Sequence, residues 1–457
     1  MRGVLLLGKR MVFVSAFFEQ PREACQNMSS KASMEILSNM EARAKKQQRA
    51  GRRDKQVHGE QALSSVELFT GAGGLALGTE LAGFRHDTVV ERNRYCCDTI
   101  RENQSRGYAA LQGWRLYPGD VRDFDYSSIV GDVDLLAGGP PCQPFSIGGK
   151  HRAFEDDRDM FPQVVRAVRE LKPRAILVEN VKGLTRKAFA NYFSYIMLQL
   201  SHPEISKRRE ESWSDHRDRL EKYHTKGSWS GLEYNVVPRL LNAANFGVAQ
   251  KRERIFFVGF RMDLGVAWTF PEETHDQDSL LVEQWISGEY WERHKVAKKQ
   301  RPVMPERVAP RVRLLRSEGA GDLFGFGKQP WRTVRDAISD LPDPETGDCS
   351  LVWNHTHNAG ARSYAGHTGS PLDEASKTLK AGDHGVPGGE NCVVKPDGSL
   401  RYFTVREAAR LQSFPDDYVF QGAWTEAMRQ LGNAVPVLLG QTVAAGIRQS
   451  LALHPRG

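Results

Sequence analysis

The sequence is poor in cysteine and has no long apolar run. Its 457 residues include only six cysteines, of which Cys96 and Cys97 are adjacent, and no C-x-x-C pair occurs. This usage argues against a disulfide framework or a zinc site and fits a reducing cytosol. The only targeting candidate, Val4 to Phe18, is broken by Lys9 and Arg10 and lacks a clear small-residue cleavage site, and no later stretch is apolar enough to span a membrane. We therefore expect a cytoplasmic protein.

Length and charge narrow the class further. A chain of 457 residues exceeds what one compact core usually organises, so two domains plus an extension are expected. Lys and Arg number 63 against 56 Asp and Glu, a net charge of +7 that suits a polyanionic partner such as nucleic acid, although solubility alone also accounts for it. Residues 1–62 have little pattern and include the basic run 44–53, so we interpret them as a flexible basic extension.

Residues 138–146 place one cysteine on a proline-bracketed turn. An apolar run, 133–137, predicts a buried strand, and Pro140 and Pro141 cannot continue its hydrogen-bond ladder. Ligands of open α/β sheets bind at the edge where the strands end, so Cys142 is placed to act as a nucleophile. The alternative is an inert buried thiol on a tight turn.

A glycine-rich turn at the end of another predicted strand precedes the cysteine turn in the chain. Residues 65–69 predict a strand, 70–74 a glycine turn and 75–82 a helix. Glu91 follows a further strand, lies 20 residues after Gly71 and suits a ribose diol, although the spacing is not a full G-x-G-x-x-G. A nucleoside-containing cofactor is expected, with Asp120 either receiving an adenine amino group or lying in an exposed turn.

Charged residues mark two further strand ends. Glu179 follows the apolar run 175–178, so its carboxyl group should share the sheet edge with Cys142. Arg252 and Arg254 precede the strand 255–259 at alternate positions and should point to one face. Such a pair either holds an anion or a base oxygen or forms surface salt bridges.

In their order along the chain, these motifs resemble the DNA cytosine-5 methyltransferases that use S-adenosylmethionine. The resemblance covers 66–259 and 402–440. It is carried by Phe69-x-Gly71-x-Gly73, Pro140-Pro141-Cys142-Gln143, Glu179-Asn180-Val181, Gln250-x-Arg252-x-Arg254, and the segments 404–412 and 430–436.

The resemblance implies a role for each matched position. Cys142 would add to C6 of a flipped-out cytosine, Glu179 would bind and protonate N3, and Arg254 with Arg252 would hold O2, with no metal required. The cofactor would be held by Phe69, Gly71, Gly73, Glu91, Asp120, Pro140, Asn433 and Ala434. The implied DNA contacts are Gln143, Ser146, Gln250, Arg406, Thr378 and Leu379, although for Thr378 and Leu379 a turn without base contact is an equal reading.

The expected architecture is an α/β protein with a Rossmann-like S-adenosylmethionine-dependent methyltransferase sheet. Residues 63–262 and 402–457 would form the catalytic domain, and 263–401 an inserted smaller target-recognition domain. Within it, the basic stretches 295–301 and 307–316 suit phosphate contacts. We expect a monomer that binds duplex DNA in the cleft between the two. Arg92 departs from the family, which often has an aromatic residue there.

Three alternatives stay open. The tRNA-methylating branch shares the cysteine loop but has a shorter stretch before the last motifs. A nicotinamide-dependent dehydrogenase would use the glycine turn and Glu91 but leave the cysteine loop and the arginines without a role. A silent DNA-binding regulator would not need Cys142 and Glu179. A bacterial modification enzyme in the cytosol is the expected setting, and whether a cognate restriction endonuclease accompanies it is left open.

Overall fold

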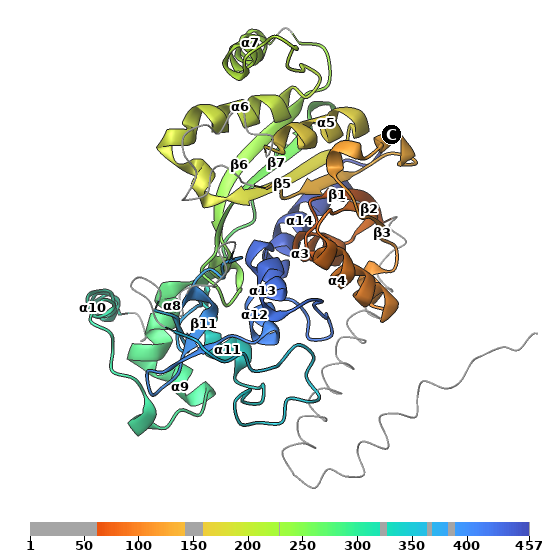
Figure 1. The fold of residues 1–457 in the computed structure, drawn as a ribbon. Helices are drawn as coiled ribbons and strands as arrows, with labels where there is room; N and C mark the ends of the chain where they lie inside the picture. Colours follow the sequence, from red (N-terminus) through yellow and green to blue (C-terminus); the bar gives the residue numbers. More distant parts are fainter. Residues whose placement is uncertain are drawn as a thin grey trace, which may run out of the picture. The chain divides into compact units, whose positions relative to one another are not determined.

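A seven-stranded sheet organises residues 63–261 (Figure 1). The computed structural model describes residues 62–141, 159–227, 229–319, 327–362, 368–382 and 389–456, so the predicted extension lies outside it except for Ala62. The strands are β1 (Leu63–Leu68), β2 (Phe84–Val90), β3 (Arg115–Tyr117), β4 (Leu135–Gly138), β5 (Ala175–Val181), β6 (Tyr234–Asn242) and β7 (Glu253–Arg261). The expected strands are confirmed, whereas β3 and β6 were not predicted.

The strand order creates a switch point beside β1. The order is β3-β2-β1-β4-β5-β7-β6, parallel from β3 to β5, with β7 antiparallel to both β5 and β6. The chain leaves β1 toward β2 on one side and returns on the other side with β4. A crevice forms where the connections diverge, at the carboxyl ends of these strands. The Rossmann-like α/β class is thus confirmed.

Helices cover both faces of this sheet, which is why its central strands are apolar without alternation. On one face, α5 (Phe161–Leu171) and α6 (Ala190–Ser201) pack on strand residues that include Leu136, Ile176 and Val178. On the other, α14 (Val437–Ala452) packs on Leu135, Ala137 and Leu177. Figure 1 shows α5 and α6 on one side of the strands and α3, α4 and α14 on the other.

The last helix packs against the first helix of the sheet. Gly78 lies in α3 (Gly74–Leu81), and a Cβ there would be 2.6 Å from the Val437 carbonyl oxygen. A Cβ at Gly440 of α14 would lie 3.2 Å from Leu75 Cδ1. These glycines allow α14 to pack closely on α3.

The remaining elements are mostly short. Between β7 and the C-terminal helices lie β8 (His275–Asp276), α8 (Gln277–Val282), α9 (Glu289–Arg293), α10 (Ala309–Ser317), β9 (Gln329–Pro330), α11 (Val334–Ile338), β10 (Ser370–Pro371), β11 (Cys392–Val394) and β12 (Leu400–Tyr402). The other helices are α4 (Arg94–Ser105), α7 (Trp213–Lys226), α12 (Val405–Leu411) and α13 (Trp424–Asn433). No helix in the described ranges is long and apolar enough to cross a membrane. The domain limits at 263 and 401 stay a prediction.

Candidate active site

The loop after β1 has a backbone conformation that favours glycine at two positions. Gly71 and Gly73 have φ angles of 58° and 87°, where a side chain would be strained. Gly74 begins α3, and a Cβ there would collide with the Val435 carbonyl oxygen. The glycine turn after β1 is therefore in close backbone contact with the last motif, residues 430–436.

Glu91 joins two strand-end loops at this edge. Its Oε2 accepts a hydrogen bond from the Gly71 N–H at 2.7 Å, and its Oε1 accepts one from the Asn93 N–H at 2.6 Å. Burial raises the pKa of Glu91, and these backbone donors oppose the shift. The carboxyl group is thus fixed at the carboxyl end of β2, beside the glycine loop.

A cavity of about 420 Å³ opens at these strand ends. It collects most of the residues predicted to bind the cofactor together with two of the predicted catalytic residues: Phe69, Gly71, Glu91, Asp120, Pro140, Asn433, Ala434, Glu179 and Arg254. Gly73 is not in its wall and instead faces the Tyr418 hydroxyl and the Trp114 ring. The volume falls within the range of ligand pockets.

Asp120 lies at the rim of the cavity within a cluster of charges. Arg122 pairs with it at 2.7 Å, and Arg92 lies 3.6 Å from the same carboxylate oxygen. The hydrogen bonds from Arg122 lower the pKa of Asp120 to about 2, so it is an anion at neutral pH. Arg92, where an aromatic residue is frequent in the family, thus belongs to the same rim.

Glu179 and Arg254 form a buried ion pair. The Arg254 Nε lies 2.8 Å from Glu179 Oε1, and both side chains are about nine-tenths buried. Burial raises the pKa of Glu179, and the charges of Arg254 and Arg252 oppose this. The carboxyl group therefore retains a proton more readily than an exposed glutamic acid.

The neighbouring residue ties β5 to the loop that follows β4. Asn180 Nδ2 donates to the Pro140 carbonyl oxygen at 3.1 Å. A Cβ at Gly139 would lie 3.1 Å from Glu179 Oε2. The chain segment that leads into Cys142 is thus held beside Glu179. Cys142 itself, with Gln143 and Ser146, lies outside the described residues, and its role stays a prediction.

Four predicted site residues lie together away from the cavity wall. Arg252 is fully buried and donates to the carbonyl oxygens of Leu379 and Gly432 at 3.2 and 2.7 Å. Gln250 is equally buried and accepts from the Leu379 N–H, while the Thr378 hydroxyl donates to the Lys251 carbonyl. As placed, these side chains contact protein backbone.

Arg406 requires a correction. It was predicted to bind DNA, but it is fully buried, and its three guanidinium nitrogens donate to the carbonyl oxygens of Trp353, Pro415 and Tyr418 at 2.8 to 3.0 Å. Each guanidinium nitrogen is already bonded within the protein, and the side chain has no exposed surface at which a phosphate could reach it. We therefore withdraw Arg406 from the DNA-binding set.

Glu67 was missed by the sequence analysis. It lines the cavity, is 1% exposed, and within the described part of the chain its Oε2 has no hydrogen-bond partner. Burial raises its pKa well above the usual value, and a hydrogen bond from the Ala76 backbone opposes this. The signal available in the sequence was a carboxylic acid within a predicted buried strand, three residues before the glycine turn that begins at Thr70.

Comparison with known proteins gives consistent relatives. The family model described as C-5 cytosine-specific DNA methylase matches residues 63–203 and 213–449. The Type II methyltransferase M.NgoMIV of Neisseria gonorrhoeae is 30% identical over 393 residues, which are 85% of this chain and 98% of that protein. The Type II methyltransferase M.Eco47II of Escherichia coli is 32% identical over 390 residues, covering 84% and 78%. That of Psychrobacter, M.PspPI, is 30% identical over 403 residues, covering 88% and 82%.

Proposed function

The chain belongs to the C-5 cytosine-specific DNA methylases, and on this premise we propose that it methylates C5 of one cytosine in a specific duplex DNA sequence, as the modification enzyme of a restriction-modification system. It is a methyltransferase whose methyl donor is S-adenosylmethionine. The observation that supports the proposal is that one cavity at the strand ends is lined both by Glu91 and by the Glu179–Arg254 pair.

The cavity suits this cofactor. Glu91 is oriented to accept hydrogen bonds from a ribose diol, and Phe69 and Pro140 supply apolar walls. The buried Oε2 of Glu67, without a partner in the described structure, favours a ligand that carries positive charge. When bound, S-adenosylmethionine supplies a methyl group activated by a positively charged sulfur.

The chain's own residues activate the cytosine. The Cys142 thiolate forms a bond to C6, which moves the electron pair of the C5–C6 double bond into the ring and makes C5 nucleophilic. Glu179 donates its proton to N3 as this charge develops, and Arg254 holds O2. After C5 has been methylated, a base or a water molecule takes the C5 proton, and the electron pair of the C5–H bond restores the C5–C6 double bond and expels the Cys142 thiolate. Glu179 then takes back the N3 proton.

The target base must leave the duplex to reach this edge. Extrusion of a base costs a few kcal/mol, which phosphate contacts and enclosure of the base must offset. Residues 263–401 are proposed to supply the sequence recognition, with duplex DNA between this region and the sheet edge.

Base-resolution methylation mapping tests the proposal. Purified protein is incubated with S-adenosylmethionine and unmethylated plasmid DNA, with bulk tRNA in parallel. We expect 5-methylcytosine in one short DNA motif, no labelled tRNA, and no product from Cys142→Ala. Cys349→Ala, which removes a partly exposed thiol far along the chain, is the matched control and should retain activity. Label confined to tRNA, or turnover by Cys142→Ala, would overturn the proposal.

A further inference from the structure

A short segment of the region proposed for recognition is hydrogen-bonded along the start of β7. We call residues 376–381 the junction segment. The Ser376 N–H donates to the Ala249 carbonyl at 2.9 Å, and the Lys251 N–H donates to the Ser376 carbonyl at 2.8 Å. The Thr378 hydroxyl donates to the Lys251 carbonyl at 2.7 Å. The junction segment is therefore fixed to residues 249–251, which lead into β7, before the chain continues to β11.

The other side of the junction segment touches the cofactor cavity. Gly432 packs so closely on Lys380 and Ala381 that a Cβ there would collide with their backbone. Gly432 and the next residue, Asn433, both line the cavity. The Asn391 side chain also bonds both the N–H and the carbonyl of Lys380, each at 3.0 Å. The segment thus lies between the sheet and the cavity wall.

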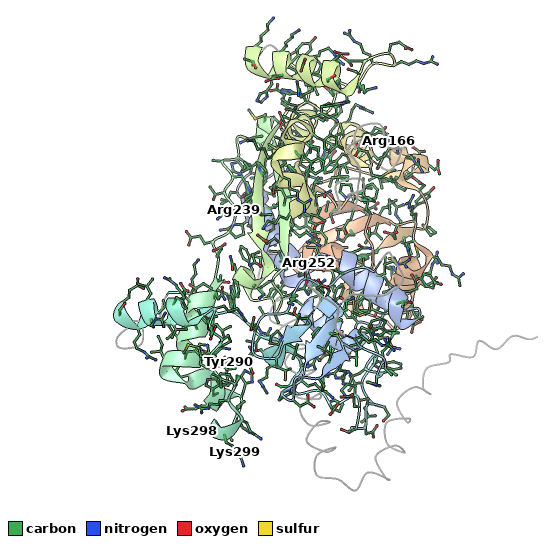
Figure 2. The ribbon with its side chains drawn as sticks, turned by 60° about the vertical axis from the view of Figure 1, so that its left-hand side comes forward. Arg166, Arg239, Arg252, Tyr290, Lys298 and Lys299 are labelled. Carbon is green, nitrogen blue, oxygen red and sulfur yellow. The ribbon has the colours of Figure 1, made fainter. Side chains whose placement is uncertain are left out.

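Arg252 connects these two contacts. One guanidinium nitrogen donates to Leu379 in the junction segment at 3.2 Å and the other to Gly432 in the cavity wall at 2.7 Å. Figure 2 shows Arg252 in the interior, where the strands meet the C-terminal helices. A displacement of the Leu379 or the Gly432 carbonyl group would therefore change the position of the Arg252 side chain, and with it the hydrogen bond to the other carbonyl group.

Because Arg252 is a buried cation, its two hydrogen bonds to carbonyl groups matter for the stability of this region. Its side chain is fully buried, and its Nε has no hydrogen-bond partner in the described parts of the chain. Burial and the nearby Arg254 lower the pKa of Arg252, whereas Glu179 raises it. A buried cation that loses an acceptor carries a large free-energy cost. Arrangements of the wall and the junction segment that keep both acceptors are thus strongly favoured.

We propose that Arg252 is a positioning residue that couples the binding of target DNA to the binding of the cofactor, through Leu379 and Gly432, and that it does not itself hold the base. DNA that orders the junction segment also orders the Gly432–Asn433 wall, so the cofactor then binds at a lower ordering cost, and the effect is reciprocal. This inference rests on the proposed function.

The test measures the dissociation constant of sinefungin, an S-adenosylmethionine analogue that cannot donate a methyl group, with and without saturating unmethylated plasmid DNA. For the parent protein we expect DNA to tighten sinefungin binding by about fivefold or more. In Arg252→Met this ratio should fall below about twofold. Arg406→Met is the matched control: that arginine is equally buried and bonded to carbonyls, but not to the cavity wall, so its ratio should match the parent.

A milder variant guards against a folding defect in Arg252→Met. Thr378→Val keeps the side-chain shape and removes only the donor to Lys251, so it should fold and still reduce the ratio by about twofold. Thermal melting of each variant monitors folding. A parent ratio near one, or unchanged ratios in Arg252→Met and Thr378→Val, overturns the coupling. Failure of the proposed function is a separate result, since the parent would then bind neither probe or leave the DNA unmethylated.

Discussion

Two cavities in the described part of the chain differ strongly in character. The strand-end cavity, of about 420 Å³, gathers three carboxyl groups with raised pKa values, those of Glu67, Glu91 and Glu179, and a buried ion pair. The other, of about 1020 Å³, lies among the short elements between β7 and β11 and is lined by Trp285, Trp331 and several basic residues. Its acidic groups are both paired with arginines: Asp373 with the largely buried Arg335, and Glu374 with the exposed Arg307. The larger cavity therefore has aromatic and basic side chains in its wall, whereas the smaller one has carboxyl groups with raised pKa values, which are suited to proton transfer.

The difference also shows how each cavity is built. Strand ends of one sheet fix the smaller cavity, so its residues sit at positions set by the topology. The larger one is assembled from loops and helices of a few residues, whose placement depends on many local contacts. The following predictions test whether the smaller cavity holds the cofactor and the reacting groups and whether the larger one contributes to DNA affinity.

The largest effect is expected from Glu179→Gln. Glutamine keeps the size of the side chain but cannot donate a proton to N3, so the single-turnover rate should fall by about 10²- to 10⁴-fold with DNA affinity retained. Glu253→Gln is the matched control, because Glu253 is the adjacent residue to Arg254 but is exposed and paired with Lys182 at 2.7 Å. An unchanged rate in Glu179→Gln would remove the smaller cavity from the chemistry.

Gly74→Ala should weaken cofactor binding by about 100-fold. The added Cβ would collide with the Val435 carbonyl and push apart the two motifs that enclose the cavity. Isothermal titration with sinefungin measures the loss. Gly113→Ala, where a Cβ would meet no atom within 4 Å, should bind as the parent does. Equal affinities for the two variants would contradict the assigned cofactor wall.

Lys299→Ala should weaken DNA binding by a smaller factor. Lys299 lines the larger cavity, and Figure 2 labels it beside Lys298 on the helices at the outer side of this region. Loss of one phosphate contact should reduce the slope of log affinity against log salt by about one, with sinefungin affinity unchanged. A filter-binding salt series checks this. An unaltered slope would place the phosphate contacts elsewhere.

The smallest effect is expected in the stability of Glu67→Gln. The pKa of Glu67 is raised in the folded state, so its stabilising contribution is present below the unfolded pKa and is lost as the pH rises through the folded value. Glutamine mimics the protonated form, so the melting temperature should rise near neutral pH and change little at acidic pH. Thermal melts at both pH values test this, and a uniform loss of stability would contradict it.

The sequence predicted the elements around the smaller cavity well. Apolar runs located β1, β4, β5 and β7, and Glu179 and Arg254 meet because strand ends converge. The hydrogen-bond partners of Arg252 and Arg406 could not be foreseen, since they are backbone carbonyls such as those of Gly432 and Trp353, far away in the sequence. An arginine in a sequence motif suggests an anion-binding site. The spacing of the motif does not reveal whether the guanidinium N–H groups are already hydrogen-bonded to backbone carbonyl groups in the folded protein.

The packing of Gly74 against Val435 has a consequence for biosynthesis. The cavity begins with the first strand of the sheet and is closed only by residues 432–435, and α14 then covers α3. During translation, a nascent chain that has emerged only as far as α12 has the strand ends but not the wall that completes the site. The wall that completes the site therefore forms only after residues 432–435 have been synthesised, and a nascent chain that stops short of them has the strand ends without an enclosed cavity.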